Sequence, residues 1–286
     1  MPTLAAIRAS NAAFTQPSQP VAVFLGGTSG IGEGMARVFA EHTKGNSDII
    51  INIFSSLPIP PSRSASEPDK SIPAREFVQC AITMMKNIQE ATRAILTKYQ
   101  KINYLVMSPG TGRDETQEGI DKKLAVHYYA RWKFLDDLWP ALKKGNDAGE
   151  QGAVMSVISA GNGALVAPTY NDLMLELSLH FIGGSRVSPW LVPQSFSEHA
   201  PAVKLIHACP GAVRTSLLFS PSWMVRASGF ILAPLILPLS MSGVECGEYM
   251  WNAIYHAATT PGPWRTGSNA RILNQRKRLW EHTSRL

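Results

Sequence analysis

Three glycines near the start of the chain have the spacing of a phosphate-binding loop. Gly26, Gly30 and Gly32 stand between the apolar run Val21–Leu25 and helix-forming residues that begin at Met35. A strand that turns into a helix here would bring unpaired backbone N–H groups and the positive end of a helix dipole to one point. Gly26 would permit the tight turn, Gly30 the approach of a pyrophosphate, and Gly32 close packing of the helix. The motif predicts nucleotide binding; the alternative is a plain structural turn.

Strands and helices that alternate along the chain would position this loop. Apolar runs predict strands at 21–25, 48–54, 76–80, 104–107, 153–158 and 203–209. Helical periodicity predicts helices at about 32–42, 87–99, 121–142, 171–180 and 245–258, while residues 1–20 are expected to form an arm and residues 55–74 a loop. This alternation is typical of an α/β fold with a doubly wound, Rossmann-like parallel sheet in three α/β/α layers. We expect a single domain over residues 1–286.

Four loops follow predicted strands and should meet at one edge of that sheet. They comprise residues 26–32, 108–112, 159–163 and 210–215. Open parallel sheets bind ligands beyond the carboxyl ends of their strands, which is where these loops would lie. The shared edge therefore predicts one site built from distant parts of the sequence.

The composition argues against several classes of partner. Of the 286 residues, 45% are apolar and 17% are charged, which is typical of a globular protein. The net charge is +6, and we interpret the basic cluster near the C-terminus as a solvated helix, since no basic stripe with interleaved aromatic residues supports nucleic-acid binding. The cluster consists of Arg271, Arg276, Lys277, Arg278 and Arg285.

Cysteine and histidine usage points away from disulfides and metal ions. Cys80, Cys209 and Cys246 lie in apolar runs and are expected to be reduced core residues. No CxxC pair or H-x-x-x-H spacing occurs, so we predict no metal site. The N-terminus lacks the pattern of a secretory signal, and we expect a cytoplasmic protein.

One uncharged stretch, residues 227–244, is almost long enough to span a bilayer. Pro234 and Pro238 interrupt it, which favours a lid over a transmembrane helix. We expect residues 216–244 to cover a small-molecule apolar substrate. Peripheral membrane contact and a homo-oligomer both stay open.

Several motifs carry a resemblance to a known family. Residues 25–32 read L-G-G-T-S-G-I-G, residues 107–110 M-S-P-G, residues 152–161 G-A-V-M-S-V-I-S-A-G and residues 210–215 P-G-A-V-R-T. Over about residues 21–258 the chain resembles the short-chain dehydrogenases/reductases, and especially fungal oxidoreductases of natural-product pathways. The resemblance implies a nicotinamide cofactor bound by Gly26, Thr28, Ser29, Gly30, Ile31, Gly32, Ser55, Pro109, Gly110, Pro210, Gly211, Val213 and Thr215.

The same resemblance implies catalytic residues. Ser159 falls on the family's catalytic serine, and Tyr170, eleven residues later, is close to the position of its tyrosine acid or base. The lysine that should follow four residues after the tyrosine, lowering its pKa, is replaced by Met174. His127 stands where the family has a helix asparagine of the proton relay; the alternative is a histidine satisfied by local packing.

A second alignment is also open. Residues 169–177 resemble a later part of the family's helix, in which case the segment with the tyrosine–lysine pair is missing between Gly163 and Pro168. Residues 181–201 have no family counterpart and are expected to form an irregular insertion. A misplaced exon boundary would produce both features, and sequencing the transcript would test this.

The cofactor preference depends on the end of the second strand. Residues 52–57, N-I-F-S-S-L, lack the acidic residue with which NAD-specific proteins bind the ribose 2′-hydroxyl. Ser55, Ser56, Arg37 and Arg63 could accept a 2′-phosphate, so we predict NADP rather than NAD.

Two functions follow from these observations. The first is an NADP-dependent oxidoreductase that acts on an alcohol or carbonyl of a bulky apolar metabolite in fungal secondary metabolism. The second is a related protein without redox chemistry, working as an isomerase, cyclase or binding protein.

Overall fold

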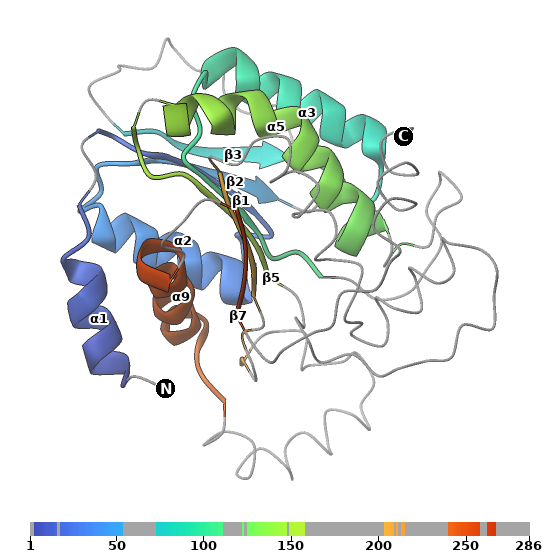
Figure 1. Cartoon of the computed structure of the whole chain (residues 1–286). Coiled ribbons are helices and arrows are strands. Elements are labelled where there is room, and N and C mark those ends of the chain that lie inside the picture. Colours follow the sequence, from blue (N-terminus) through green and yellow to red (C-terminus); the bar gives the residue numbers. More distant parts are fainter. Residues whose placement is uncertain are drawn as a thin grey trace, which may run out of the picture.

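The computed structural model describes residues 3–15, 18–53, 73–110, 122, 125–147, 149–157, 203–208, 210, 213–214, 240–257 and 262–266. These residues form a parallel sheet covered by helices on both faces (Figure 1).

Seven strands make up the sheet, in the order β3-β2-β1-β4-β5-β6-β7. Every neighbouring pair is parallel. The strand order reverses between β1 and β4, which makes the sheet doubly wound and confirms the predicted fold class. The strands are β1 (Val21–Leu25), β2 (Asp48–Ile53), β3 (Arg75–Gln79), β4 (Tyr104–Met107), β5 (Ala153–Val157), β6 (Lys204–Ala208) and β7 (Gly262–Thr266).

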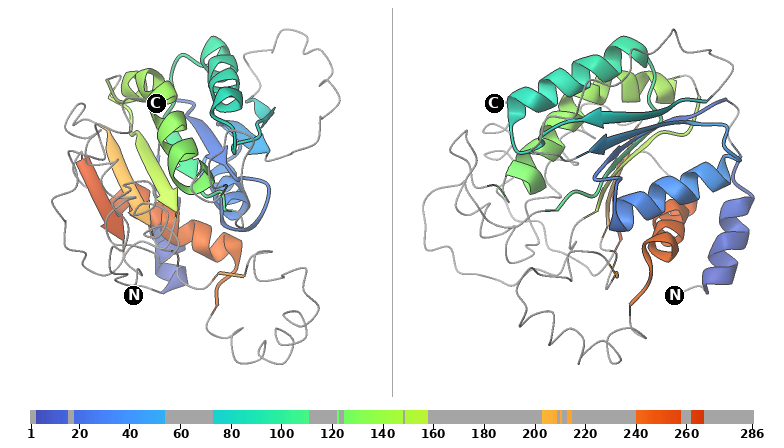
Figure 2. Two further views of the ribbon diagram at one scale, coloured as in Figure 1. Left: turned by 90° about the vertical axis from the view of Figure 1, so that its right-hand side faces the viewer. Right: turned by 180° about the vertical axis from the view of Figure 1, so that it is seen from behind.

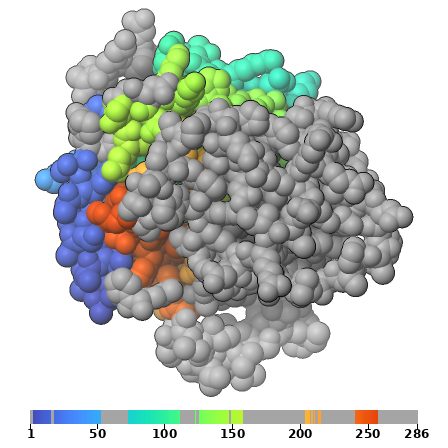
Figure 3. Space-filling model, in the orientation of Figure 1, coloured from blue at the N-terminus to red at the C-terminus, as the bar shows by residue number. Residues whose placement is uncertain are grey.

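Helices on both faces explain why the central strands are continuous apolar runs. The helices α1 (Leu4–Ala12), α2 (Gly30–His42) and α9 (Gly243–Asn252) lie on one side of the sheet, and α3 (Met85–Lys98) and α5 (Ala130–Asp147) on the other (Figure 2). In the space-filling view, α3 and α5 lie along the top while α1 and α9 lie below (Figure 3). Every residue of β1, β4 and β5 is buried, as expected for strands covered on both faces.

Two short π-helical turns adjoin the long helices. The turn η1 (Ala125–Tyr129) leads directly into α5, and η4 (Ala253–Ala257) follows α9. The helix predicted at 121–142 is therefore a π-helical turn plus a regular helix, and it extends to Asp147.

Glycines let α2 and α9 cross at backbone contact. A Cβ atom on Gly34 would overlap the carbonyl oxygen of Gly243, and one on Gly243 would overlap the carbonyl oxygen of Gly30. Nearby, the Trp251 indole N–H donates to the Met35 carbonyl oxygen at 2.8 Å. The first turn of α9 is thus fixed against the first turn of α2.

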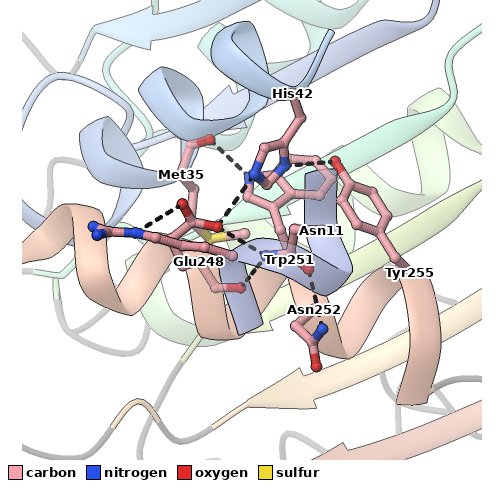
Figure 4. Close-up of polar contacts among 8 residues, drawn as sticks. Asn11, Met35, His42, Glu248, Trp251, Asn252 and Tyr255 are labelled. Atoms are coloured by element: carbon pink, nitrogen blue, oxygen red, sulfur yellow. Dashed lines mark hydrogen bonds and ion pairs between the residues drawn. The ribbon is translucent and has the colours of Figure 1, made fainter. Parts of the chain in front are cut away.

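The segment 1–20, which the sequence predicts to be an arm leading into the first strand, contains a helix that was not predicted, because residues 4–12 form α1. Thr3 caps this helix by accepting from Ala6 N at 3.3 Å. Asn11 is fully buried, and its Nδ2 donates to the Glu248 carboxylate at 2.8 Å and to the Glu248 backbone oxygen at 2.9 Å (Figure 4). Contacts with α9 therefore order this segment.

Strand β7 was not predicted, and several predictions fall on residues that the structure does not describe. The helix at 171–180, the insertion at 181–201, most of the loop at 55–74 and residues 216–239 of the lid lie outside the described residues. Within the described helices, none combines the length and the apolar character needed to cross a membrane.

Two of the three cysteines confirm the predicted core positions. Cys80 and Cys246 are buried free thiols, 3% and 0% exposed. Burial raises the pKa of each thiol to about 12, so both are protonated and unreactive at neutral pH. Cys209 lies outside the described residues.

Candidate nucleotide-binding and catalytic site

The glycine-rich turn lies between β1, which ends at Leu25, and α2, which begins at Gly30. Gly26 has φ 77° and Gly30 has φ 62°, backbone conformations that favour glycine. Ser29 precedes the helix in an extended conformation, and its side chain makes no capping hydrogen bond. The backbone N–H groups of the first helical turn therefore receive no side-chain cap from the residue that usually provides one.

Close packing holds this turn against the loop that follows β4. A Cβ atom on Gly26 would lie 2.9 Å from Pro109 N, and one on Gly32 would overlap the Gly26 carbonyl oxygen and the Ser108 hydroxyl. Ser108 in turn donates to the Leu25 carbonyl oxygen, from its backbone N at 3.0 Å and from its Oγ at 3.2 Å. Gly26 and Gly32 thus have the geometry that the sequence motif required, while their part in cofactor binding stays a prediction.

The two loops leave the sheet where the strand order reverses. Strands β1 and β4 are neighbours, with Leu25 paired to Met107. Open α/β sheets bind their ligands in the crevice at this point. Four predicted cofactor residues, Thr28, Ser29, Pro109 and Gly110, extend from these two strand ends, and Thr28, Ser29 and Gly110 are exposed.

A third loop is tied to the same region through α9. Val213 pairs with Met241 in an isolated parallel bridge, and Arg214 N donates to Met241 O at 2.9 Å. Met241 precedes the capped start of α9, where Ser242 and Glu245 form a capping box. Because the first turn of α9 contacts Gly30, this bridge connects the predicted cofactor residue Val213 to the glycine-rich turn.

Arg131, which was not among the predicted site residues, joins two of the strand ends that border the candidate site. Its side chain is 5% exposed and comes from α5. Nη1 donates to Met107 O at 2.5 Å and to Ser156 Oγ at 2.9 Å. Nη2 donates to Pro109 O at 2.8 Å and to Val157 O at 3.2 Å. One guanidinium group therefore joins the carboxyl ends of β4 and β5.

No described carboxylate pairs with this guanidinium. Its contacts are carbonyl oxygens and one hydroxyl, and its Nε has no hydrogen-bond partner among the described residues. Burial lowers the pKa of Arg131 to about 9, so the side chain still carries its charge at neutral pH. A signal was present in the sequence: Arg131 stands three residues after Tyr128 and four before Leu135, on the buried stripe of the helix.

The predicted catalytic residues are only partly described. His127 lies in the π-helical turn η1, partly buried, on the segment that leads to Arg131. Ser159 and Tyr170, with Met174 and both alternative alignments, lie outside the described residues, as do Ser55, Gly211 and Thr215. Of the residues around Ser159, Val157 is described, and it ends β5 two positions earlier.

These features define a Rossmann-type α/β protein with a candidate nucleotide site at the switch point of its sheet. Comparison with proteins of known sequence shows which oxidoreductases this chain is similar to. An oxidoreductase of Emericella nidulans, AN1596, is 29% identical over 278 residues, covering 93% of this chain and 80% of its own. The short-chain dehydrogenase/reductase SAT2 of Stachybotrys chartarum is 25% identical over 277 residues, covering 87% and 76%. No model of a protein family matches the chain.

Solved structures support the same fold. The NADPH-bound carbonyl reductase from chicken fatty liver superimposes with a TM-score of 0.60 at 13% identity, over 90% of this chain and 99% of that one. The 3-ketoacyl-(acyl-carrier-protein) reductase from Brucella melitensis, complexed with NADH, has a TM-score of 0.57 at 21% identity, over 87% and 96%. The predicted resemblance to short-chain dehydrogenases/reductases and to fungal oxidoreductases is confirmed, and the relatives of similar sequence carry the name oxidoreductase or short-chain dehydrogenase/reductase.

Proposed function

We propose that this protein is an NADP-dependent oxidoreductase that oxidises or reduces an alcohol or carbonyl group on a bulky apolar metabolite in fungal secondary metabolism. The observation that carries the proposal is the glycine-rich turn at the switch point. Gly26 and Gly30 have positive φ there, and Ser29 does not cap the helix that follows. An anionic diphosphate would satisfy the N–H groups at the start of α2.

The residues of the site fit a dinucleotide. The turn has no side chain at Gly26 or Gly30, and it packs on the β4 loop beside Pro109. When bound, the nicotinamide supplies the hydride donor or acceptor. In the proposed reaction Ser159 polarises the substrate oxygen, a tyrosine at position 170 exchanges the proton, and His127 passes it onward.

Three observations support NADP over NAD. Residues 52–57, where an NAD-specific protein would carry an acid, contain none, and Asn52 near the end of β2 is neutral and buried. The Arg37 side chain is 65% exposed, and its ion pair with Glu33 is long at 3.7 Å. Such an exposed pair contributes little, so the guanidinium could turn to a 2′-phosphate.

The bridge between Val213 and Met241 supports the placement of the proposed substrate lid, residues 216–244. Val213 lies just before the lid, and Met241 lies near its end. Since Met241 leads into α9, both ends of the lid would be anchored beside the nucleotide site.

Nicotinamide fluorescence with a matched pair of glycine variants tests nucleotide binding. In Gly30→Val the new side chain would occupy the space of the diphosphate, and we expect binding of NADPH to be lost. Gly45→Val is the control, because Gly45 also has positive φ (79°) but follows α2 and has no atom near its Cβ position. Gly45→Val should bind NADPH as the wild type does; equal affinity in Gly30→Val would overturn the proposal.

The cofactor preference is tested by a second matched pair. Arg37→Ala should raise the Kd for NADPH more than the Kd for NADH, since only NADPH carries the 2′-phosphate. Arg93→Ala, an exposed arginine on the opposite side of the sheet, should change neither. Equal effects of Arg37→Ala on both cofactors would contradict the NADP assignment.

Turnover separates redox chemistry from the alternative function. With a panel of ketones and secondary alcohols, Ser159→Ala and Tyr170→Phe should each lower hydride transfer by ~10²–10⁴-fold and leave cofactor binding intact. A silent Tyr170→Phe would remove that tyrosine from the site. Met174 in place of lysine favours the non-redox alternative, which would be supported by cofactor binding without hydride transfer to any substrate of the panel.

A further inference from the structure

The geometry points to Arg131 as a positioning residue that sets the spacing of the carboxyl ends of β4 and β5, from which the proposed nucleotide and catalytic loops extend, and that places a buried positive charge beside them. This inference rests on the proposed function for its chemical consequence. Its structural part can be tested without any cofactor.

The contacts of Arg131 reach two loops with different proposed tasks. Met107 and Pro109 belong to the strand end and loop that support the glycine-rich turn. Ser156 and Val157 belong to the end of β5, just before Ser159. A planar guanidinium holds its four acceptors in a fixed arrangement, which a flexible ammonium does not.

The same contacts exclude a direct role in substrate binding. Each Nη atom donates to two acceptors, so neither has a free N–H group for a substrate. Nε, which has no hydrogen-bond partner among the described residues, is the guanidinium nitrogen bonded to the side-chain stem. Arg131 therefore acts on the site through the atoms that it holds and through its charge.

The charge is not cancelled by its described surroundings. None of the four groups that Arg131 contacts is titratable. On α5 itself, Lys133 pairs with Asp137 at 2.8 Å, and Asp136 is exposed. In a buried setting a cation favours negative charge on nearby groups, so Arg131 would help a substrate oxygen bound beside the carboxyl ends of β4 and β5 to release its proton.

Hydrogen exchange on the cofactor-free protein tests the structural part. The variants are Arg131→Met, which is neutral, Arg131→Lys, which keeps a charge without the planar fork, and Lys133→Met as a control on the same helix. In both Arg131 variants we expect peptides covering residues 104–110 and 153–157 to exchange roughly tenfold faster, the equivalent of one lost hydrogen bond. Lys133→Met should leave both peptides unchanged. Unchanged exchange in folded Arg131→Met would overturn the structural part.

The pH dependence of turnover tests the charge. In the oxidation direction, turnover rises as the proton acceptor loses its proton, and Arg131→Met should move this rise about 1 pH unit upward. Arg131→Lys should move it less, and Lys133→Met not at all. A profile equal to wild type in Arg131→Met would overturn the role of the charge. Absence of hydride transfer in the wild type would defeat the proposed function instead, and hydrogen exchange would still decide the structural part.

Discussion

Among the described residues, two charged side chains are buried, and the protein treats them in opposite ways. Glu248 of α9 is 6% exposed and has cationic and polar partners: its carboxylate accepts from Asn11 at 2.8 Å and from His42 at 3.2 Å, and it pairs with Arg8 at 3.4 Å (Figure 4). Arg131, at the carboxyl ends of the strands, has only neutral partners.

We interpret this difference as one between a charge that stabilises the fold and a charge that serves the proposed site. The Glu248 cluster, formed by Arg8, Asn11, His42 and Glu248, links α1, α2 and α9. An unpaired buried charge costs stability, so its retention calls for a reason other than stability. The position of Arg131 between the two candidate loops supplies such a reason.

The largest stability loss is expected from Glu248→Ala. This change leaves buried donors of Asn11 and His42 without their acceptor, and we expect the free energy of unfolding to fall by ~3–5 kcal/mol. Urea denaturation measures it. The Kd for NADPH of the folded variant should stay at the wild-type value, because the cluster lies at the end of α2 away from the glycine-rich turn. A large rise in that Kd would contradict the proposal that Glu248 stabilises the fold without taking part in nucleotide binding.

Arg131→Met should lower stability less but impair function. The variant leaves three carbonyl oxygens without their donor, which is opposed by relief from burying the charge, so we expect a loss of about 2 kcal/mol at neutral pH. Above pH 9 the contribution of Arg131 to the free energy of unfolding begins to depend on pH. Because burial lowers the folded-state pKa of Arg131 to about 9, the unfolded chain binds more protons above that pH, and wild-type stability gains from this group as pH rises. Urea titrations from pH 8 upward should show the gain in wild type and not in Arg131→Met.

Asn11→Ala tests whether the Glu248 cluster holds α1 in place. Asn11 makes two hydrogen bonds to Glu248, and its Oδ1 accepts from Asn252 at 3.0 Å. We expect a loss of about 1–3 kcal/mol and faster proteolysis within α1. Ser18→Ala, which removes a partly buried hydrogen bond outside the Glu248 cluster, is the control and should leave cleavage within α1 unchanged. An uncleaved α1 in Asn11→Ala would show that other contacts hold the helix.

The smallest effect is expected from His42→Gln. Burial lowers the pKa of His42, although Glu248 opposes the shift. The unfolded chain therefore binds the proton more readily, and this group's contribution to stability is lost as pH falls through the ordinary range of a histidine. Thermal unfolding between pH 5 and 8 should show a shallower loss toward acid in His42→Gln. A steeper loss would mean that the charged imidazole is the stabilising form.

Most strands of the sheet could be predicted from the sequence, but few of the side-chain contacts could. β1 and β4 have the predicted bounds because a buried strand between two helix layers must be a short apolar run. α1 was missed because its order depends on Glu248, 237 residues away, and β7 because the G-P-W-R-T segment depends on pairing with β6. The glycine-rich turn could be predicted from spacing. Arg131 could be placed on a helix, but its contacts come from two other segments, the ends of β4 and β5, that only the fold brings beside it.

The backbone crossing of α2 and α9 has a consequence for the order of events during synthesis. The Met35 carbonyl oxygen receives its hydrogen bond from Trp251, 216 residues later, and Gly34 contacts Gly243 in the same crossing. At a ribosomal rate of about 5–20 residues per second, the partner emerges on the order of 10–40 seconds after the glycine-rich turn. The glycine-rich turn is among the first parts of the chain to be made, yet α9, which packs against the helix that follows the turn, is made nearly last. If the proposed function is correct, we expect a nascent chain to bind NADPH only after α9 has been made.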